Sequence, residues 1–179
     1  GSEKIPPSLE DAVLSFLISC SVRSLRGDGQ EHCSMLVHVT RFLDVQHEVE
    51  IQVRKFFSDV KQRLTRQIDN VLIEERLKRI WSEDFCKTSA QVKNVFPTEG
   101  GVEYSWEKVH ESLVRIIGDI KIMQVNGSAK VPLDYDQHKS TGLKVIAIGG
   151  DKLARGLTLE GLTISYFVRT SKMYDTLMQ

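Results

Sequence analysis

A glycine-rich basic loop between two apolar runs is the part of the sequence best suited to chemistry. The stretch IAIGGDKLARGLTLEGLTISYF occupies residues 146–167. Gly149–Gly150 leaves the main chain bare, so a phosphate group can approach the backbone N–H groups closely. Lys152 supplies a point charge, and Arg155 supplies a forked donor suited to phosphate. The pattern predicts contact with a phosphate or a nucleic-acid backbone; a tight connection with solvated basic side chains is the alternative.

The sequence contains only half-matches to metal-dependent nuclease chemistry. Nuclease cores often use an acidic residue followed by a [DE]-x-Lys triplet to hold a cation and position water. Asp59-Val-Lys61 lies in a predicted helix, and Asp119-Ile-Lys121 has no evident upstream acidic partner, so both are interpreted as chance matches. No Walker-type GxxxxGK[ST] pattern and no HxH or HExxH spacing occurs. Catalytic residues therefore stay unknown, and no metal site is predicted.

Three further side chains form a candidate cluster in a polar loop at 126–142. Asp134, Asp136 and His138 are ligand types that could hold a cation. A solvated surface loop is the other interpretation, and it is the one favoured here.

The elements that must position these residues alternate between strand and helix. Short apolar runs rich in β-branched residues predict strands at 34–40, 120–125, 144–148 and 163–168. Helical spacing predicts helices between them, with Ser8 and Ser105 as N-caps. This alternation predicts an α/β fold with a parallel sheet covered by helices on both faces. The helical stretch at about 44–95 exceeds what one crossover requires and is interpreted as an insertion. Because parallel sheets bind ligands beyond the carboxyl ends of their strands, Gly149–Gly150 falls where a ligand is expected.

The composition indicates one soluble domain with a core of ordinary size. Of the 179 residues, 41% are hydrophobic and 27% are charged, and the formal net charge is zero. A nucleic-acid surface must therefore be a local patch. Three cysteines without CxxC spacing argue against a disulfide framework and favour the cytoplasm, and no signal peptide or membrane-length apolar run occurs. Gly1–Ser2 is interpreted as a tag remnant and 3–179 as a single domain cut from a longer protein.

The basic loop resembles motif V of superfamily-two helicases, which reads A-T-D-x-x-A-R-G-L-D in DEAD-box proteins. The matching residues, in register, are Asp151, Ala154, Arg155, Gly156 and Leu157. Two positions depart from the pattern: Gly150 stands where Thr is usual, and Thr158 stands where Asp is usual. The missing Asp puts a ribose contact in doubt.

A longer resemblance covers most of the chain. The stretches SMLVHVTRF, MQVNG, IGGDKLARGLTLEGLTISYF and SKMYDTLMQ resemble the Z-one (Z1) domain of bacterial proteins classed as endonucleases. The resemblance implies a RecA-like second helicase lobe. It also implies a nucleic-acid-binding set, which is Thr40, Arg41, Asn126, Ser128, Gly149, Gly150, Lys152, Arg155, Gly156 and Thr158. Asp151 and Thr158 are expected close to a nucleotide.

The resemblance implies a hydrolase system rather than a complete enzyme in this chain. The expected protein is a bacterial endonuclease with a helicase-like ATPase, acting in restriction-modification or phage defence. Expected partners are DNA, an upstream lobe of the same polypeptide, and DNA methyltransferases or other restriction proteins, with no membrane. The full-length protein is expected to use ATP and Mg²⁺, and this chain alone is expected to hold no cofactor and to be inactive. The alternative is a degenerate helicase lobe that only docks DNA or protein; the residues themselves give no support to a nuclease site within the domain.

Overall fold

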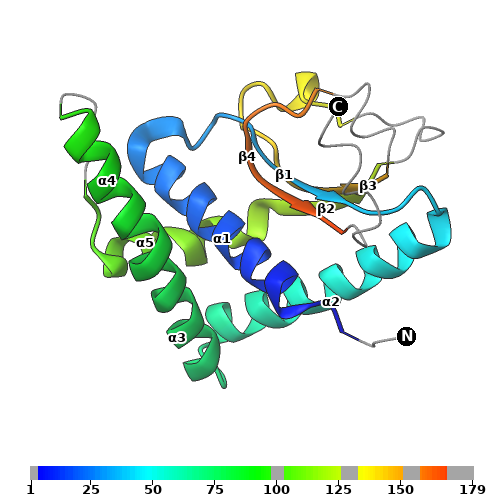
Figure 1. The fold of residues 1–179 in the computed structure, drawn as a ribbon, viewed down its shortest axis with the longest axis horizontal. Helices are drawn as coiled ribbons and strands as arrows, with labels where there is room; N and C mark the ends of the chain where they lie inside the picture. Colours follow the sequence, from blue (N-terminus) through cyan, green and yellow to red (C-terminus); the bar gives the residue numbers. More distant parts are fainter. Residues whose placement is uncertain (1–3, 98–102, 126–132, 151–157, 169–179) are drawn as a thin grey trace, which may run out of the picture.

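A four-stranded, all-parallel sheet with helices packed against it forms the protein (Figure 1). The computed structural model describes residues 4–97, 103–125, 133–150 and 158–168. The strands are β1 (Cys33–His38), β2 (Ile120–Gln124), β3 (Lys144–Gly149) and β4 (Leu162–Phe167). They lie in the order β2-β3-β1-β4. The predicted fold class is confirmed as an α/β fold whose all-parallel sheet is flanked by helices, which is consistent with the RecA-like three-layer type.

Burial along the strands follows their places in the sheet. All six residues of β1 and all six of β3 are buried, because both strands are central and covered on both faces. The edge strand β2 is partly exposed, and β4 is exposed or half-buried along its whole length. The continuous apolar runs were therefore sound predictors of the two central strands.

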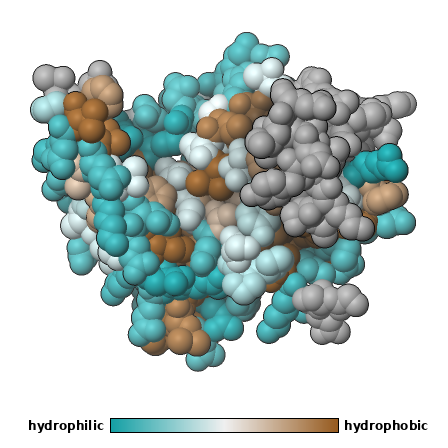
Figure 2. Space-filling view, in the orientation of Figure 1, coloured by the Kyte–Doolittle hydropathy of each residue, from teal (hydrophilic) through white to brown (hydrophobic). Residues whose placement is uncertain are grey.

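Five α-helices occupy most of the rest of the described chain. They are α1 (Pro7–Arg23), α2 (Leu43–Arg66), α3 (Val71–Ile80), α4 (Lys87–Val95) and α5 (Trp106–Ile116). Shorter helical turns are η1 (Ser24–Asp28), η2 (Trp81–Cys86), η3 (Ile117–Asp119) and η4 (Asp136–His138). Helix α4 extends furthest from the sheet, and hydrophobic side chains are exposed at its outer end (Figure 2). None of the helices that the structure describes is long and apolar enough to cross a membrane.

The two predicted helix caps had different outcomes. The Ser105 side chain accepts a hydrogen bond from the Lys108 backbone N–H, as the capping prediction required. The prediction of Ser8 as a cap is wrong, because α1 begins at Pro7 and its N-cap is Pro6, two residues before Ser8. Proline suits that position, since its missing N–H would have no helical partner there.

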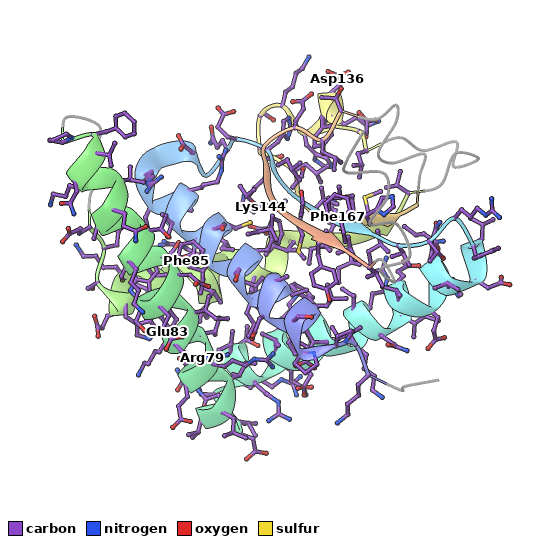
Figure 3. All side chains as sticks on the ribbon, in the orientation of Figure 1. Arg79, Glu83, Phe85, Asp136, Lys144 and Phe167 are labelled. Carbon is purple, nitrogen blue, oxygen red and sulfur yellow. The ribbon has the colours of Figure 1, made fainter. Side chains whose placement is uncertain are left out.

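An ion-pair cluster fixes α3 against the start of α1. The Arg76 guanidinium contacts the Glu10 carboxylate at 2.5 Å and the Asp11 carboxylate at 2.6 Å. Its third nitrogen donates to the Pro7 carbonyl at 2.9 Å. Arg79, labelled in Figure 3, lies 3.4 Å from the second Asp11 oxygen. Because Arg76 is largely shielded from water, these contacts are less screened than an ordinary surface pair.

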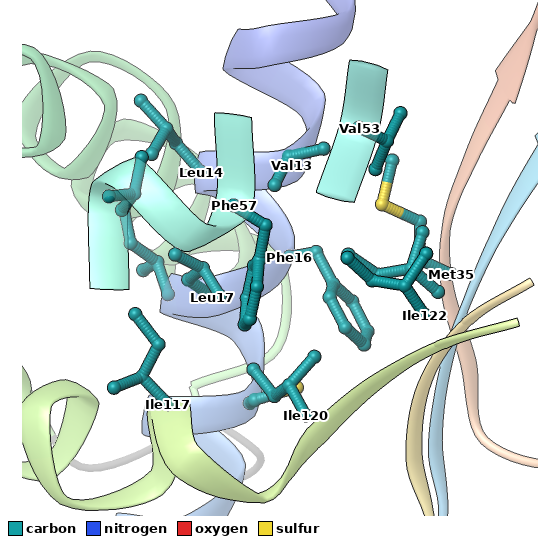
Figure 4. Close-up of a cluster of buried hydrophobic side chains, with 14 of the residues drawn as sticks. Val13, Leu14, Phe16, Leu17, Met35, Val53, Phe57, Ile117, Ile120 and Ile122 are labelled. Atoms are coloured by element: carbon teal, nitrogen blue, oxygen red, sulfur yellow. The ribbon is translucent and has the colours of Figure 1, made fainter. Parts of the chain in front are cut away.

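The main core lies between the helices and one face of the sheet. Phe16 and Leu17 of α1, Phe57 of α2, and Met35 and Ile122 of the sheet meet there (Figure 4). On the opposite face, Leu36, Val145 and Ala147 pack beneath Leu133, Tyr135 and Leu143. The segment that carries those last three residues includes η4, which lies on the side of the sheet opposite the helices (Figure 1).

Candidate nucleic-acid interface

The ends of β1 and β3, which the sequence pattern identified separately as candidate binding segments, lie together at the carboxyl edge of the sheet. His38 at the end of β1 is paired in register with Gly149 at the end of β3. The Val39 backbone N–H donates to the Gly149 carbonyl at 2.8 Å, which extends the pairing by one residue. Thr40 and Arg41 therefore leave the sheet directly beside Gly150.

Close packing explains why residue 150 is a glycine. A Cβ atom at Gly150 would lie 2.6 Å from Gln46 Nε2, 2.8 Å from the Thr40 carbonyl oxygen and 3.3 Å from Arg41 Cα. Gln46 is buried in the first turn of α2, and its Nε2 donates to the Thr40 carbonyl at 2.8 Å. The end of β1 and the end of β3 therefore pack closely, because the Gln46 side chain fills the space that a side chain at residue 150 would need.

Cationic and aromatic side chains are exposed around this edge. Thr40 and Arg41 are both exposed, and the Arg41 guanidinium lies 5.4 Å from the centre of the Phe42 ring. Phe42 is 58% exposed. Phe167, labelled in Figure 3 at the end of β4, is 55% exposed. The Phe167 ring also lies 5.4 Å from the His38 ring. Arginine can neutralise a phosphate, and exposed aromatic rings can stack on bases, so this edge has the side-chain chemistry for a single nucleic-acid strand.

The structure places four of the predicted site residues at one edge. Thr40, Arg41, Gly149 and Gly150 lie side by side there. Thr158 is exposed and precedes β4 by a few residues, and it is not part of that group. The remaining predictions lie outside the described residues; they are Asn126, Ser128, Asp151, Lys152, Arg155 and Gly156.

Sequence reasoning missed Gln46, Phe42 and Phe167 at this site. Gln46 occupies a polar position in a charged helix, and nothing local distinguishes it from a solvated residue. Phe42 and Phe167 were open to prediction, since Phe42 lies just beyond one predicted strand and Phe167 near the carboxyl end of another, at the ligand-binding edge.

Apart from the carboxyl edge, a basic cleft of about 760 Å³ lies beside the edge strand β2. Its polar lining includes Arg54, Lys61, Lys121, Asp134 and His138, above apolar residues of β2 and α2. The Arg54 guanidinium donates to the Ile122 carbonyl, which covers part of the free strand edge. This cleft lies along the strand and not at its carboxyl end.

The three candidate cation ligands in the loop at 126–142 have other partners. Asp134 accepts a hydrogen bond from the Gln137 backbone N–H at 3.0 Å, and His138 Nε2 lies 3.3 Å from Lys121 Nζ. The Lys139 ammonium, 2.7 Å from the Asp136 carboxylate, holds the pKa of that carboxyl below its usual value. Across the residues with described positions, no group of three or more His, Cys, Asp or Glu side chains could hold a metal ion. The solvated-loop interpretation is the better one for the described side chains.

Comparison with known proteins gives one match over nearly the whole chain. The family model described as the Z1 domain matches residues 8–179. No curated protein and no solved structure matches the chain.

Proposed function

Because this chain belongs to the Z1 domain family, we propose that the carboxyl edge of its sheet binds a nucleic-acid backbone. The observation that carries the proposal is the packing of Gly150 against Thr40 and Arg41, which brings the glycine-rich end of β3 next to two exposed residues that can bind phosphate. An arginine fork and a threonine hydroxyl are usual partners of phosphodiester oxygens. Among the described residues of the edge, few side chains could read base identity, so binding is expected to be largely independent of sequence.

The second part of the proposal concerns what this binding does. The chain is the second lobe of a helicase-like ATPase within a bacterial endonuclease system of the restriction or phage-defence type. An upstream lobe of the same polypeptide supplies the ATP and Mg²⁺ site, and Asp151 and Arg155 couple that site to the bound strand. DNA methyltransferases or other restriction proteins are the further partners, and the cytoplasm is the compartment. The similarity of residues 149–157 to helicase motif V supports this part.

A docking module without motor chemistry is the second candidate. Exposed apolar side chains on α4 and just beyond it favour it, namely Val92, Val95 and Phe96. Contiguous exposed apolar residues are characteristic of protein-binding surfaces. Thr158, in place of the aspartate of motif V, points in the same direction.

Arg41→Ala is expected to weaken binding of single-stranded DNA by about three- to tenfold on unrelated sequences. The loss of one phosphate contact should also lower the salt slope of log Kd by about one. Arg155→Ala is expected to do the same. Fluorescence anisotropy with two unrelated oligonucleotides over a range of salt concentrations measures both quantities.

Arg66→Ala is the matched control for Arg41→Ala. Arg66 is also exposed, but it lies at the opposite end of α2, so its replacement should leave affinity and slope unchanged. Equal effects of Arg41→Ala and Arg66→Ala would indicate diffuse charge attraction and would remove the carboxyl edge as the binding site.

ATP turnover by a polypeptide carrying both lobes separates the motor from the docking module. DNA is expected to stimulate turnover, and Arg155→Ala is expected to lower the stimulated rate by about tenfold or more. If the protein is folded and binds DNA but shows no DNA-stimulated ATP turnover, the motor function is contradicted and the docking function is supported.

A further inference from the structure

Two cysteines whose spacing in the sequence matches no common cysteine motif are in contact in the core. Cys20 of α1 and Cys33 of β1 place their sulfur atoms 3.3 Å apart, and each side chain is 1% exposed. The sequence offered no CxxC pair, so the contact arises only because the end of α1 packs across the start of β1. Both thiols are free in the structure, as is the exposed Cys86.

The surroundings make the two thiols unequal. The Cys20 thiol donates to Cys33 Sγ, and this hydrogen bond lowers the pKa of Cys33; the Thr163 hydroxyl and the positive charges of Arg23 and Lys144 act in the same direction. Burial raises the pKa of Cys20. Both cations are held in place, since Arg23 donates to the His32 carbonyl at 3.2 Å and Lys144, labelled in Figure 3, donates to the Gly29 carbonyl at 2.9 Å. Cys33 is therefore the nucleophilic sulfur and Cys20 the proton-bearing neighbour.

A small oxidant has a short route to Cys33. The Thr163 hydroxyl lies 3.8 Å from Cys33 Sγ, and Thr163 is an exposed residue of the edge strand β4. Edge strands open more readily than central strands, because only one neighbour holds them. A displacement of β4 at Thr163 would uncover the Cys33 sulfur.

We propose that Cys20 and Cys33 are an oxidation site that closes reversibly to a disulfide in the presence of a peroxide. The Cys33 thiolate attacks hydrogen peroxide, forms a sulfenic acid and releases hydroxide. Cys20 sulfur then attacks Cys33 sulfur, the S–O bond breaks, and the departing oxygen leaves as water with the Cys20 proton. The sulfurs must approach from 3.3 Å to about 2.05 Å, a shift that side-chain rotation and a small movement of α1 can supply. An external dithiol reverses the reaction.

The test uses a Cys86→Ser background, which removes intermolecular disulfides. Hydrogen peroxide is expected to lower the intact mass by about 2 Da and to abolish both remaining thiols in a thiol titration. Tryptic digestion should then yield peptides 5–23 and 27–41 joined by a bond that dithiothreitol cleaves. The closed loop should also raise the melting temperature by roughly 5 °C. Retention of both thiols, or oxidation only after unfolding in urea, would overturn the proposal.

Single serine variants test the assigned roles. With Cys20→Ser added, peroxide is expected to raise the mass by about 16 Da at Cys33, because the sulfenic acid has no thiol to condense with. With Cys33→Ser added, the mass should stay unchanged at the same dose. Circular dichroism confirms that each variant is folded, and oxidation of Cys20 in preference to Cys33 would refute the assigned order of attack.

Discussion

Gly161→Ala is expected to lower the free energy of unfolding by about 3 kcal/mol or more. Gly161 has φ +63°, a conformation that L-residues adopt only at a cost. A Cβ atom there would lie 1.8 Å from the His32 carbonyl oxygen and 2.6 Å from its carbon. Both atoms belong to the backbone, so they cannot rotate away as a side chain could. The Gly161 carbonyl also accepts the Ser34 N–H at 2.9 Å, and relief of the clash would break the join between β1 and the start of β4.

Gly27→Ala is the matched control, because it separates the backbone cost from the clash. Gly27 also has a positive φ, +98°, but nothing lies within 4 Å of the position of its Cβ. Its replacement should cost about 1–2 kcal/mol, the cost of the conformation alone. Urea denaturation of both variants gives the comparison. Similar losses in the two variants would mean that the turn before β4 yields easily, contrary to the packing described above.

The strands were predictable because their burial leaves a mark in the local sequence. The runs at 34–40 and 144–148 are mostly apolar and rich in β-branched residues, which is the pattern of a strand covered on both faces. Parallel pairing then required their carboxyl ends to share an edge, and Thr40, Arg41 and Gly149–Gly150 do meet there. The part of the candidate site that lies at the carboxyl ends of the strands was therefore predictable.

Contacts between distant segments were not predictable, since the sequence around one partner does not indicate which residue the other will be. The Gln46 amide fills the space that Gly150 leaves, although about a hundred residues separate them. The sulfurs of Cys20 and Cys33 meet only because α1 crosses the start of β1. The same reason explains the stretch at 126–142, which was interpreted as a polar loop. Its described part contributes Leu133 and Tyr135 to the core of the second face, and two buried residues in a polar stretch show no periodicity.

Gly150→Ala is expected to destabilise the protein by about 2–3 kcal/mol and to weaken DNA binding by about tenfold. The new methyl group must displace either the Gln46 amide, at 2.6 Å, or the Thr40 carbonyl, at 2.8 Å. Either movement shifts Arg41 relative to Gly150. Gly150→Thr introduces the residue usual in motif V. It should destabilise the protein and weaken DNA binding more than Gly150→Ala does, since threonine is larger. Gly118→Ala is the control, because only Lys61 Nζ, at 4.0 Å, lies near its Cβ position.

A double-mutant cycle with Gln46→Ala identifies which contact forbids the side chain. Gln46→Ala alone should cost about 1–2 kcal/mol, because it removes the hydrogen bond to the Thr40 carbonyl. Combined with Gly150→Ala, it should cost at least about 1 kcal/mol less than the sum of the two, since the methyl group then occupies the vacated space. Chemical denaturation measures stability in all four proteins, and anisotropy measures their DNA affinity. Additive losses would show that the Thr40 carbonyl, not Gln46, excludes the side chain. Unchanged DNA affinity in Gly150→Ala would mean that bound DNA does not depend on the register between Gly150 and Arg41, and the binding surface would then have to be sought elsewhere on the molecule.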